Sequence, residues 1–139
     1  MIMNKLTPDL MVKNVNETVE FYRNILGFQL VMAVPKNSEE ICMEMPKDKE
    51  LDYALMKNGN VEIMFQTKES LSGDITAFRG MEISASVSFY VDIGNVDKYY
   101  EDIKNKAEIV KELHTTWYGM QEFYIRDCNG YILGFAEQR

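Results

Sequence analysis

The chain has 139 residues, 46% of them hydrophobic and 27% charged, which is typical of a folded globular protein and excludes an intrinsically disordered one. The formal net charge of −7 argues against nucleic acid as a partner, because phosphate binding depends on clustered lysines and arginines, and leaves neutral or cationic ligands as easier partners. No stretch approaches the roughly 20 apolar residues of a membrane span, and the first apolar stretch is too short for a signal peptide, so we expect a cytoplasmic protein without a membrane partner. Cys42 and Cys128 form neither a CxxC pair nor a disulfide framework and are expected to be free thiols.

The first organised segment, LMVKNVNETVEFYRNILGFQLVM, predicts a strand, a helix and a second strand. Alternation around Leu10 is typical of a strand, and apolar residues then recur at helical spacing over residues 15–26. Asn14 is a suitable N-cap for this helix, with Glu17 completing an approximate capping box. Gly27 follows the helix where a left-handed C-cap is expected.

A β-hairpin is predicted next, from the strand DYALM through the turn KNGN to the strand VEIMFQ. The Asn58-Gly59 pair is a strong signal for a tight hairpin turn. Alternation in the second strand places Glu62 and Met64 on one face. Residues 67–80 mix polar and small residues and are expected to form a linker between two halves of the chain.

The second half of the chain repeats this plan. Alternation over residues 87–91 predicts a strand, Gly94 and Asn95 break it, and a helix with one apolar stripe follows. The stripe consists of Val96, Tyr99, Tyr100 and Ile103. Three strand-like segments complete the half, AEIVKEL, GMQEFYIRD and YILGFAE, and a turn at Asn129-Gly130 joins the last two.

This internal repeat indicates two tandem βαβββ modules, at about residues 4–67 and about residues 83–138. We therefore expect an α+β fold in a single domain over residues 1–139. The sheets of the two modules are expected to pack into one cupped, curved surface.

Two stretches carry a resemblance to a known family: TPDLMVKNVNETVEFYRNILGF and FYIRDCNGYILGF. They resemble the vicinal-oxygen-chelate superfamily, which includes glyoxalase I, extradiol dioxygenases and bleomycin resistance proteins, and the resemblance covers nearly the whole chain. It implies paired βαβββ modules that form a curved mixed sheet around a cavity, commonly completed in a homodimer. It is a poor guide to the reaction, since one fold hosts many functions.

In the metal-using members of the superfamily, four side chains converge on the ion, usually His or Glu. The resemblance carries these positions onto Thr7, onto either Glu62 or Met64, onto Ser86 and onto Gly134. At most one of the four is a strong ligand, whereas a Zn, Ni or Fe site needs three or more suitable donors. We therefore expect no metal cofactor.

Three titratable residues are candidates for catalysis. His114 is the only histidine and is either a general base or ligand contact, or a polar loop residue, which is the simpler interpretation. Glu62 either faces the cavity as a base or cation ligand, or lies on a solvated strand face. Glu122, like His114, is a candidate to assist Glu62.

Aromatic residues and methionines are candidates for lining a ligand site. Trp117 and Tyr118 either border the family cavity or fill the core under a loop, and Tyr124 and Phe89 are expected by alternation to face the same side. Several methionines are candidates for an adaptable lining: Met43, Met45, Met56 and Met64.

Two functions remain open. The favoured hypothesis is a non-catalytic, metal-free protein that binds a small molecule, an antibiotic or a metabolite, which can be cationic. The alternative is a glyoxalase-type lyase or other metal-dependent enzyme of the superfamily that uses Glu62. Gly134 supports the first hypothesis, because a glycine at a family ligand position is expected to leave open space in the cavity.

Overall fold

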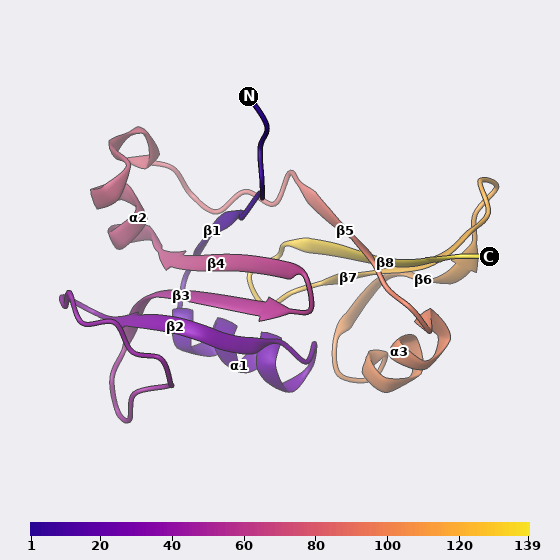
Figure 1. Cartoon of the computed structure of the whole chain (residues 1–139), viewed down its shortest axis with the longest axis horizontal. Coiled ribbons are helices and arrows are strands. Elements are labelled where there is room, and N and C mark those ends of the chain that lie inside the picture. Colours follow the sequence, from indigo (N-terminus) through magenta and orange to yellow (C-terminus); the bar gives the residue numbers. More distant parts are fainter. The chain divides into compact units, whose positions relative to one another are not determined.

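The computed structural model describes all residues, 1–139, and divides into two compact units, Met1–Ile83 and Ser84–Arg139. Each unit is a four-stranded mixed sheet with helices (Figure 1), so the predicted α+β fold is confirmed. None of the helices has the length and apolar character that crossing a membrane requires.

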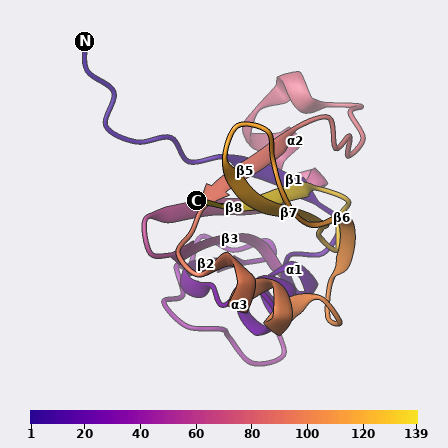
Figure 2. The same cartoon turned by 90° about the vertical axis from the view of Figure 1, so that its right-hand side faces the viewer.

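The sheet of the N-terminal unit has the strand order β1-β4-β3-β2, in which only the β1–β4 pair is parallel. Its strands are β1 (Asp9–Val12), β2 (Gln29–Pro35), β3 (Leu51–Asn58) and β4 (Val61–Thr67). The β3–β4 hairpin turns at Gly59, whose φ of 57° lies in the left-handed region, as the Asn-Gly signal predicted. Residues 1–8 precede the sheet as an extended segment (Figure 2).

Helix α1 (Val15–Asn24) covers one face of this sheet. The Asn14 side chain accepts a hydrogen bond of 2.9 Å from the Glu17 amide, which confirms the predicted N-cap. Tyr22 is fully buried, and its ring centroid lies 4.7 Å from that of Phe65 on β4. Aromatic packing therefore fixes the helix on the sheet.

The segment over residues 67–80, expected to join the two halves of the chain, lies between β4 and β5, and it contains α2 (Lys68–Asp74) and the short η1 (Thr76–Phe78), which were not predicted. Leu71 is the only buried residue of α2, so the helix has no apolar stripe that a periodicity argument detects. Its N-terminus is instead specified by a cap, because the Thr67 hydroxyl accepts a hydrogen bond of 3.2 Å from the Ser70 amide.

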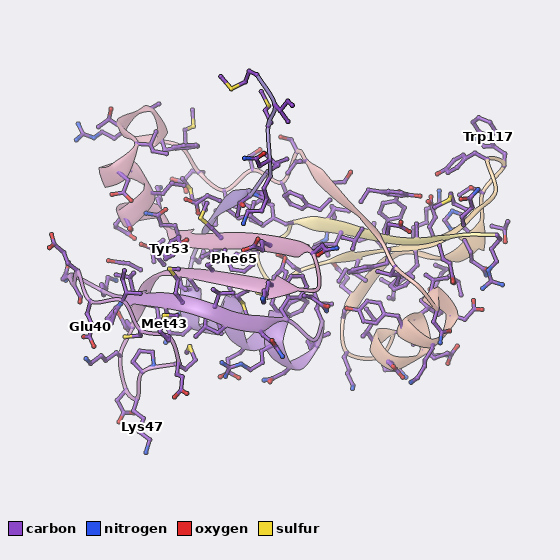
Figure 3. All side chains as sticks on the ribbon, viewed as in Figure 1. Glu40, Met43, Lys47, Tyr53, Phe65 and Trp117 are labelled. Carbon is purple, nitrogen blue, oxygen red and sulfur yellow. The ribbon has the colours of Figure 1, made fainter.

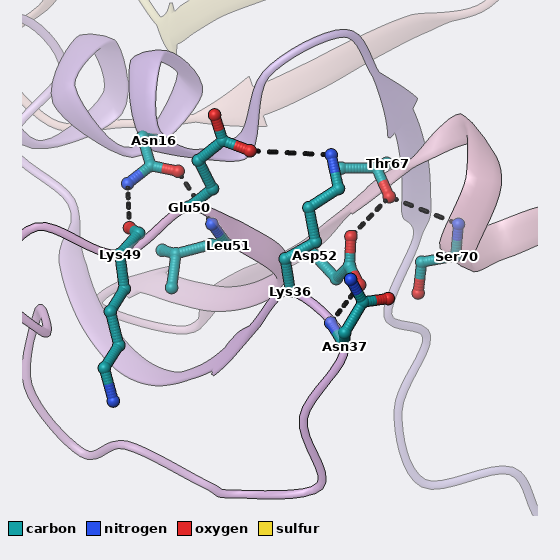
Figure 4. A network of polar contacts seen from close by, with 9 residues as sticks. All are labelled: Asn16, Lys36, Asn37, Lys49, Glu50, Leu51, Asp52, Thr67 and Ser70. Atoms are coloured by element: carbon teal, nitrogen blue, oxygen red, sulfur yellow. Dashed lines mark hydrogen bonds and ion pairs between the residues drawn. The ribbon is translucent and has the colours of Figure 1, made fainter.

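Side-chain amides and carboxylates hold the end of the β2–β3 loop against α1 and β4 (Figure 4). Asn16 on α1 donates to the Lys49 carbonyl and accepts from the Leu51 amide, both at 2.9 Å. Asp52 accepts a hydrogen bond of 3.0 Å from the Thr67 hydroxyl. The start of β3 is thereby fixed to α1 on one side and to the end of β4 on the other.

The sheet of the C-terminal unit has the order β5-β8-β7-β6, with only β5–β8 parallel, and so repeats the N-terminal plan. Its strands are β5 (Ser88–Asp92), β6 (Glu108–Thr115), β7 (Met120–Arg126) and β8 (Ile132–Gln138). The predicted repeat of two βαβββ modules is therefore present.

Helix α3 (Val96–Ile103) covers one face of this second sheet, below the strands in the view of Figure 1. Tyr99 packs its ring 5.0 Å from Phe135, and Tyr100 packs 5.0 Å from Phe123. Side chains alternate along strands, so Phe123 and Phe135 define the helix-covered face. We call the opposite side of this sheet the helix-free face; its positions include Tyr90, Glu122, Tyr124, Gly134 and Ala136.

Candidate functional site

Three residues of the helix-free face form one row across the sheet. Tyr90 on β5 is in register with Gly134 on β8, which is in register with Tyr124 on β7. In the adjacent row, Ala136 on β8 is in register with Glu122 on β7. Strand β8 therefore presents its two smallest side chains between residues of β5 and β7.

Glu122 is the centre of a polar cluster on this face. Its side chain is only 2% exposed. Oε2 accepts a hydrogen bond of 2.5 Å from the Tyr90 hydroxyl, and Oε1 accepts one of 2.8 Å from the Tyr118 hydroxyl. We call Tyr90, Tyr118, Glu122 and Tyr124 the tyrosine–glutamate cluster. A buried carboxylate needs such donors, since leaving it unpaired would be costly.

The small residues of β8 make this cluster possible. Tyr90 reaches Glu122 across the intervening strand, at the place where β8 carries Gly134 and Ala136. A Cβ atom at position 134 would lie 2.4 Å from Cε2 of Tyr124, so the tyrosine ring lies directly against the glycine. The expectation of open space over Gly134 is therefore wrong: the Tyr124 ring fills it.

Burial and the Glu122 carboxylate together keep the neighbouring phenols protonated. Burial first, and then the hydrogen bond to Glu122, raises the pKa of Tyr90. The hydrogen bond to Glu122 is the main cause that raises the pKa of Tyr118, whereas burial is the main cause for Tyr124. All three hydroxyls therefore keep their protons at neutral and mildly alkaline pH.

His114 lies beside this cluster, in β6, so its interpretation as a loop residue is wrong. It is in register with Glu122, and its Nε2 is 3.8 Å from Oε1 of that residue. Nδ1 lies 2.7 Å from the carbonyl oxygen of Glu112. A carbonyl only accepts, so Nδ1 carries a proton, and Nε2 is buried without a hydrogen-bond partner.

Phe89 does not belong to this site, and the expectation that it shares a face with Tyr124 is wrong. It is in register with Leu133, which is fully buried on the helix-covered face. Its neighbour Tyr90 takes the predicted place. The small residues alternating at positions 134 and 136 were a signal that larger side chains from neighbouring strands cross β8 there.

Trp117 and Tyr118 lie in the turn between β6 and β7. Trp117 is 94% exposed and projects from the tip of the hairpin (Figure 3), which excludes the interpretation that it fills the core. Its ring makes an edge contact with Tyr118 at a centroid distance of 5.2 Å. The only tryptophan of the chain thus lies beside a tyrosine that binds Glu122.

The family metal positions do not offer a suitable donor set. Thr7 and Ser86 lie outside the strands, before β1 and β5, and Gly134 has no side chain. Glu62 is paired with Lys5 at 2.6 Å. Both Glu62 and Met64 alternate with the buried Ile63, so both point away from α1. No group of three or more His, Cys, Asp or Glu residues gathers in a way that suits a metal ion.

The methionines do not share one pocket. Met56 is fully buried in the core of the N-terminal unit, so its expected place in a ligand site is wrong. Met43 and Met45 line an open hollow of about 450 Å³ together with Arg23 and Phe28. This hollow lies at the edge strand β2.

A second polar pocket, of about 390 Å³, opens between α2 and the N-terminal sheet. Its acidic lining residues are Asp9, Asp52 and Asp74, and Tyr53 and Gln66 also line it. Asp9 Oδ1 is buried without a hydrogen-bond partner, and burial followed by repulsion from Asp74 raises the pKa of Asp9 to about 6. No local sequence pattern predicts that the three aspartates lie together, because they come from three separate elements, β1, β3 and α2.

Comparison with known proteins gives a family and a set of similar folds. The sequence model of the Glyoxalase/Bleomycin resistance protein/Dioxygenase superfamily matches residues 3–135. No curated protein sequence matches the chain. Among solved structures, TioX from Micromonospora sp. ML1 is similar at 16% identity and a TM-score of 0.69, with 99% of this chain and 100% of that one covered.

Two further similar structures carry the superfamily in their descriptions. A glyoxalase/bleomycin resistance protein/dioxygenase family enzyme from Burkholderia phytofirmans PsJN has 16% identity and a TM-score of 0.72, covering 96% of this chain and 97% of that one. A glyoxalase/bleomycin resistance protein/dioxygenase from Nocardioides has 16% identity and a TM-score of 0.70, covering 99% of this chain and 85% of that one. At these identities the similarity shows the fold alone.

Proposed function

Because the chain belongs to the glyoxalase/bleomycin resistance protein/dioxygenase superfamily, we propose that it is a metal-free protein that binds a small molecule, an antibiotic or a metabolite, on its helix-free face. The observation that carries this proposal is the tyrosine–glutamate cluster. Three aromatic rings and a buried carboxylate lie together there, and both Tyr90 and Tyr118 remain about half exposed. Aromatic side chains around a few fixed polar groups are typical of small-molecule sites.

The residues at the family metal positions also support a site without metal. Of these positions only Glu62 offers a carboxylate, and Lys5 already binds it. At Gly134 the available space is filled by the Tyr124 ring. The position at which the family resemblance expects a metal ligand is therefore covered by the aromatic ring of Tyr124 in this chain.

The experiment that tests this function is a fragment screen followed by NMR. A ¹⁵N-labelled chain, treated with EDTA, is titrated with a library of small aromatic and polar fragments. We expect hits that shift the amide signals of Tyr90, Glu122, Tyr124 and Gly134. Hits that perturb only other parts of the chain, or no hits at millimolar concentration, would contradict the proposal.

A metal-dependent lyase is the second candidate, because Glu62 is a carboxylate at one family metal position. The same labelled chain distinguishes the two functions when Ni²⁺ or Zn²⁺ is added after EDTA treatment. A stoichiometric ion that is lost in Glu62→Ala would favour the lyase. Fragment binding that is unchanged by metal favours the binding protein.

We also propose that the protein acts in the cytoplasm as a homodimer, as the family resemblance implies. Light scattering on the purified protein tests the assembly. A monomer at micromolar concentration would contradict it without affecting the proposed site, which lies within one unit of the chain.

A further inference from the structure

The hydroxyl protons of Tyr90 and Tyr118 both point inward, toward Glu122. Each phenol has one hydroxyl proton, and those of Tyr90 and Tyr118 are both directed at the oxygens of Glu122. The outward side of each phenol oxygen therefore offers only lone pairs. Because the pKa values of both phenols are raised, these protons stay on the phenol oxygens and point at Glu122 over the physiological pH range.

His114 lies beside the cluster. Its Nδ1 donates to the Glu112 carbonyl, and its buried Nε2 lies 3.8 Å from Glu122 Oε1 without a hydrogen-bond partner. Apart from His114, no basic side chain of the C-terminal unit lies within 4 Å of the Glu122 carboxylate. The negative charge of the buried carboxylate is thus not balanced by a lysine or arginine.

The other charged residues around the tyrosine–glutamate cluster do not neutralise the charge of Glu122. Asp92 is in register with Ala136 and adds an exposed carboxylate to the same face. Lys111, on the edge strand β6, is in register with Tyr124 but is exposed and makes no ion pair with Glu122. Arg126 is paired with Glu108 at 2.6 Å.

From this arrangement, and resting on the proposed function, we infer that the site selects organic cations that carry N–H donors, such as amidinium, guanidinium or primary ammonium groups on a small aromatic body. The phenol oxygens of Tyr90 and Tyr118 accept those N–H groups, while Glu122 supplies the opposite charge behind them. The half-exposed rings contribute cation–π attraction. The Glu122 carboxylate repels an anion at the cluster, and a quaternary ammonium has no proton to donate.

Three probes with the same aromatic body test this selectivity: benzamidine, benzyltrimethylammonium and benzoate. Trp117, the only tryptophan, contacts Tyr118 and reports binding by its fluorescence, and calorimetry gives the affinity. We expect benzamidine to bind about tenfold or more tightly than the quaternary ion, which lacks charge-assisted hydrogen bonds, and benzoate not to bind. Equal affinities, or tighter binding of benzoate, would overturn the inference.

Variants locate the effect. Glu122→Gln removes the buried charge and is expected to weaken benzamidine binding about tenfold. Glu112→Gln is the matched control, because it removes the same charge from the adjacent strand β6. The Glu112 carboxylate accepts a hydrogen bond from Tyr100 of α3 and not from the cluster. We expect this variant to bind benzamidine within about twofold of the wild type. An equal loss in both variants would mean that only net charge matters and would overturn the inference.

A second charge variant covers the case in which Glu122→Gln does not fold. Asp92 is exposed, so Asp92→Lys keeps the fold but places a cation on the same face, and we expect weaker benzamidine binding and measurable benzoate binding. Unchanged affinities in Asp92→Lys would overturn the inference. If none of the three probes binds while the fragment screen finds other hits on the helix-free face, the inferred ligand class is wrong and the proposed function stands.

Discussion

Tyr124 and Gly134 face each other across β7 and β8, and the tyrosine ring occupies the space in which a side chain at position 134 would begin. The distance of 2.4 Å between a Cβ at 134 and Cε2 of Tyr124 is too short for any real contact. This pair explains a glycine in the interior of a buried strand, where it otherwise reduces stability.

We therefore predict that Gly134→Ala destabilises the protein by about 1–3 kcal/mol, the usual cost of overpacking a rigid site. Urea unfolding of the purified variants measures this change. Gly94→Ala is the matched control, because nothing lies within 4 Å of its Cβ and its φ is not left-handed. In the background of Tyr124→Ala the cost of Gly134→Ala should fall by more than half; an unchanged cost would show that the ring is not the cause.

Local sequence signals predicted much of the fold. The apolar stripe of residues 15–26 and the cap at Asn14 specified α1, and the Asn58-Gly59 pair specified the β3–β4 hairpin. These features depend on residues that are near each other in the chain. The helix α2 was missed because its cap at Thr67 has no accompanying apolar periodicity.

The candidate site was predicted only in part, because its geometry depends on strand order. Glu122, Tyr118 and Tyr124 were selected from β7 and the preceding turn, but Tyr90 was missed and Phe89 was chosen in its place. Alternation alone does not say which face of β5 points toward the helix, so a shift of one residue exchanges the two faces. The contact between Tyr90 and Glu122 depends on β8 lying between β5 and β7, which no local signal specifies.

The N-cap of α1 gives a second prediction. Asn14 accepts a hydrogen bond from the Glu17 amide, so Asn14→Ala leaves that amide without its partner and should destabilise the protein by about 1 kcal/mol. Asn95, the N-cap residue of α3, makes no side-chain cap bond and has a φ of 62°. Asn95→Gly is therefore the control and should cost much less. Similar losses in denaturant unfolding of the two variants would contradict the assigned cap.

The N-terminus of α3 depends on a carboxylate from β8 instead. Glu137 accepts hydrogen bonds of 3.0 Å from the amides of Asn95 and Val96, and these bonds lower the pKa of Glu137. A lowered pKa means that the carboxylate stabilises the fold above its unfolded value of 4.5, and this contribution is lost as the pH falls through the folded value. We expect Glu137→Gln to lower the thermal unfolding temperature at pH 7 and to have a smaller effect at pH 3, because part of the wild-type carboxylate is then protonated. A loss of equal size at both pH values would show that the charge is not involved.

Asp9 gives a prediction of the opposite sign. Burial and the nearby Asp74 raise its pKa from 3.8 to about 6, and its Oδ1 has no hydrogen-bond partner. With a raised pKa, the neutral Asp9 carboxyl contributes its full stabilisation below pH 3.8, the unfolded value. This contribution is lost as the pH rises through about 6, because the folded protein must then hold a poorly solvated charge. Asp9→Asn removes that charge and should therefore raise the free energy of unfolding at pH 8 by about 1 kcal/mol, after discounting for solvent screening of a half-buried group.

The gain in Asp9→Asn should decrease between pH 6 and pH 4 and be absent at pH 4, where the wild-type carboxyl is itself mostly neutral in the fold. Urea unfolding at a series of pH values measures this difference. Glu39→Gln, which neutralises an exposed carboxylate in the loop after β2, is the control and should show no such pH dependence. Asp74→Asn should reduce the gain, because it removes the repulsion that disfavours the Asp9 charge. A gain that is the same at pH 4 and pH 8 would show that Asp9 does not titrate in this range. The gain could then not come from the cost of holding a charged Asp9 next to Asp74.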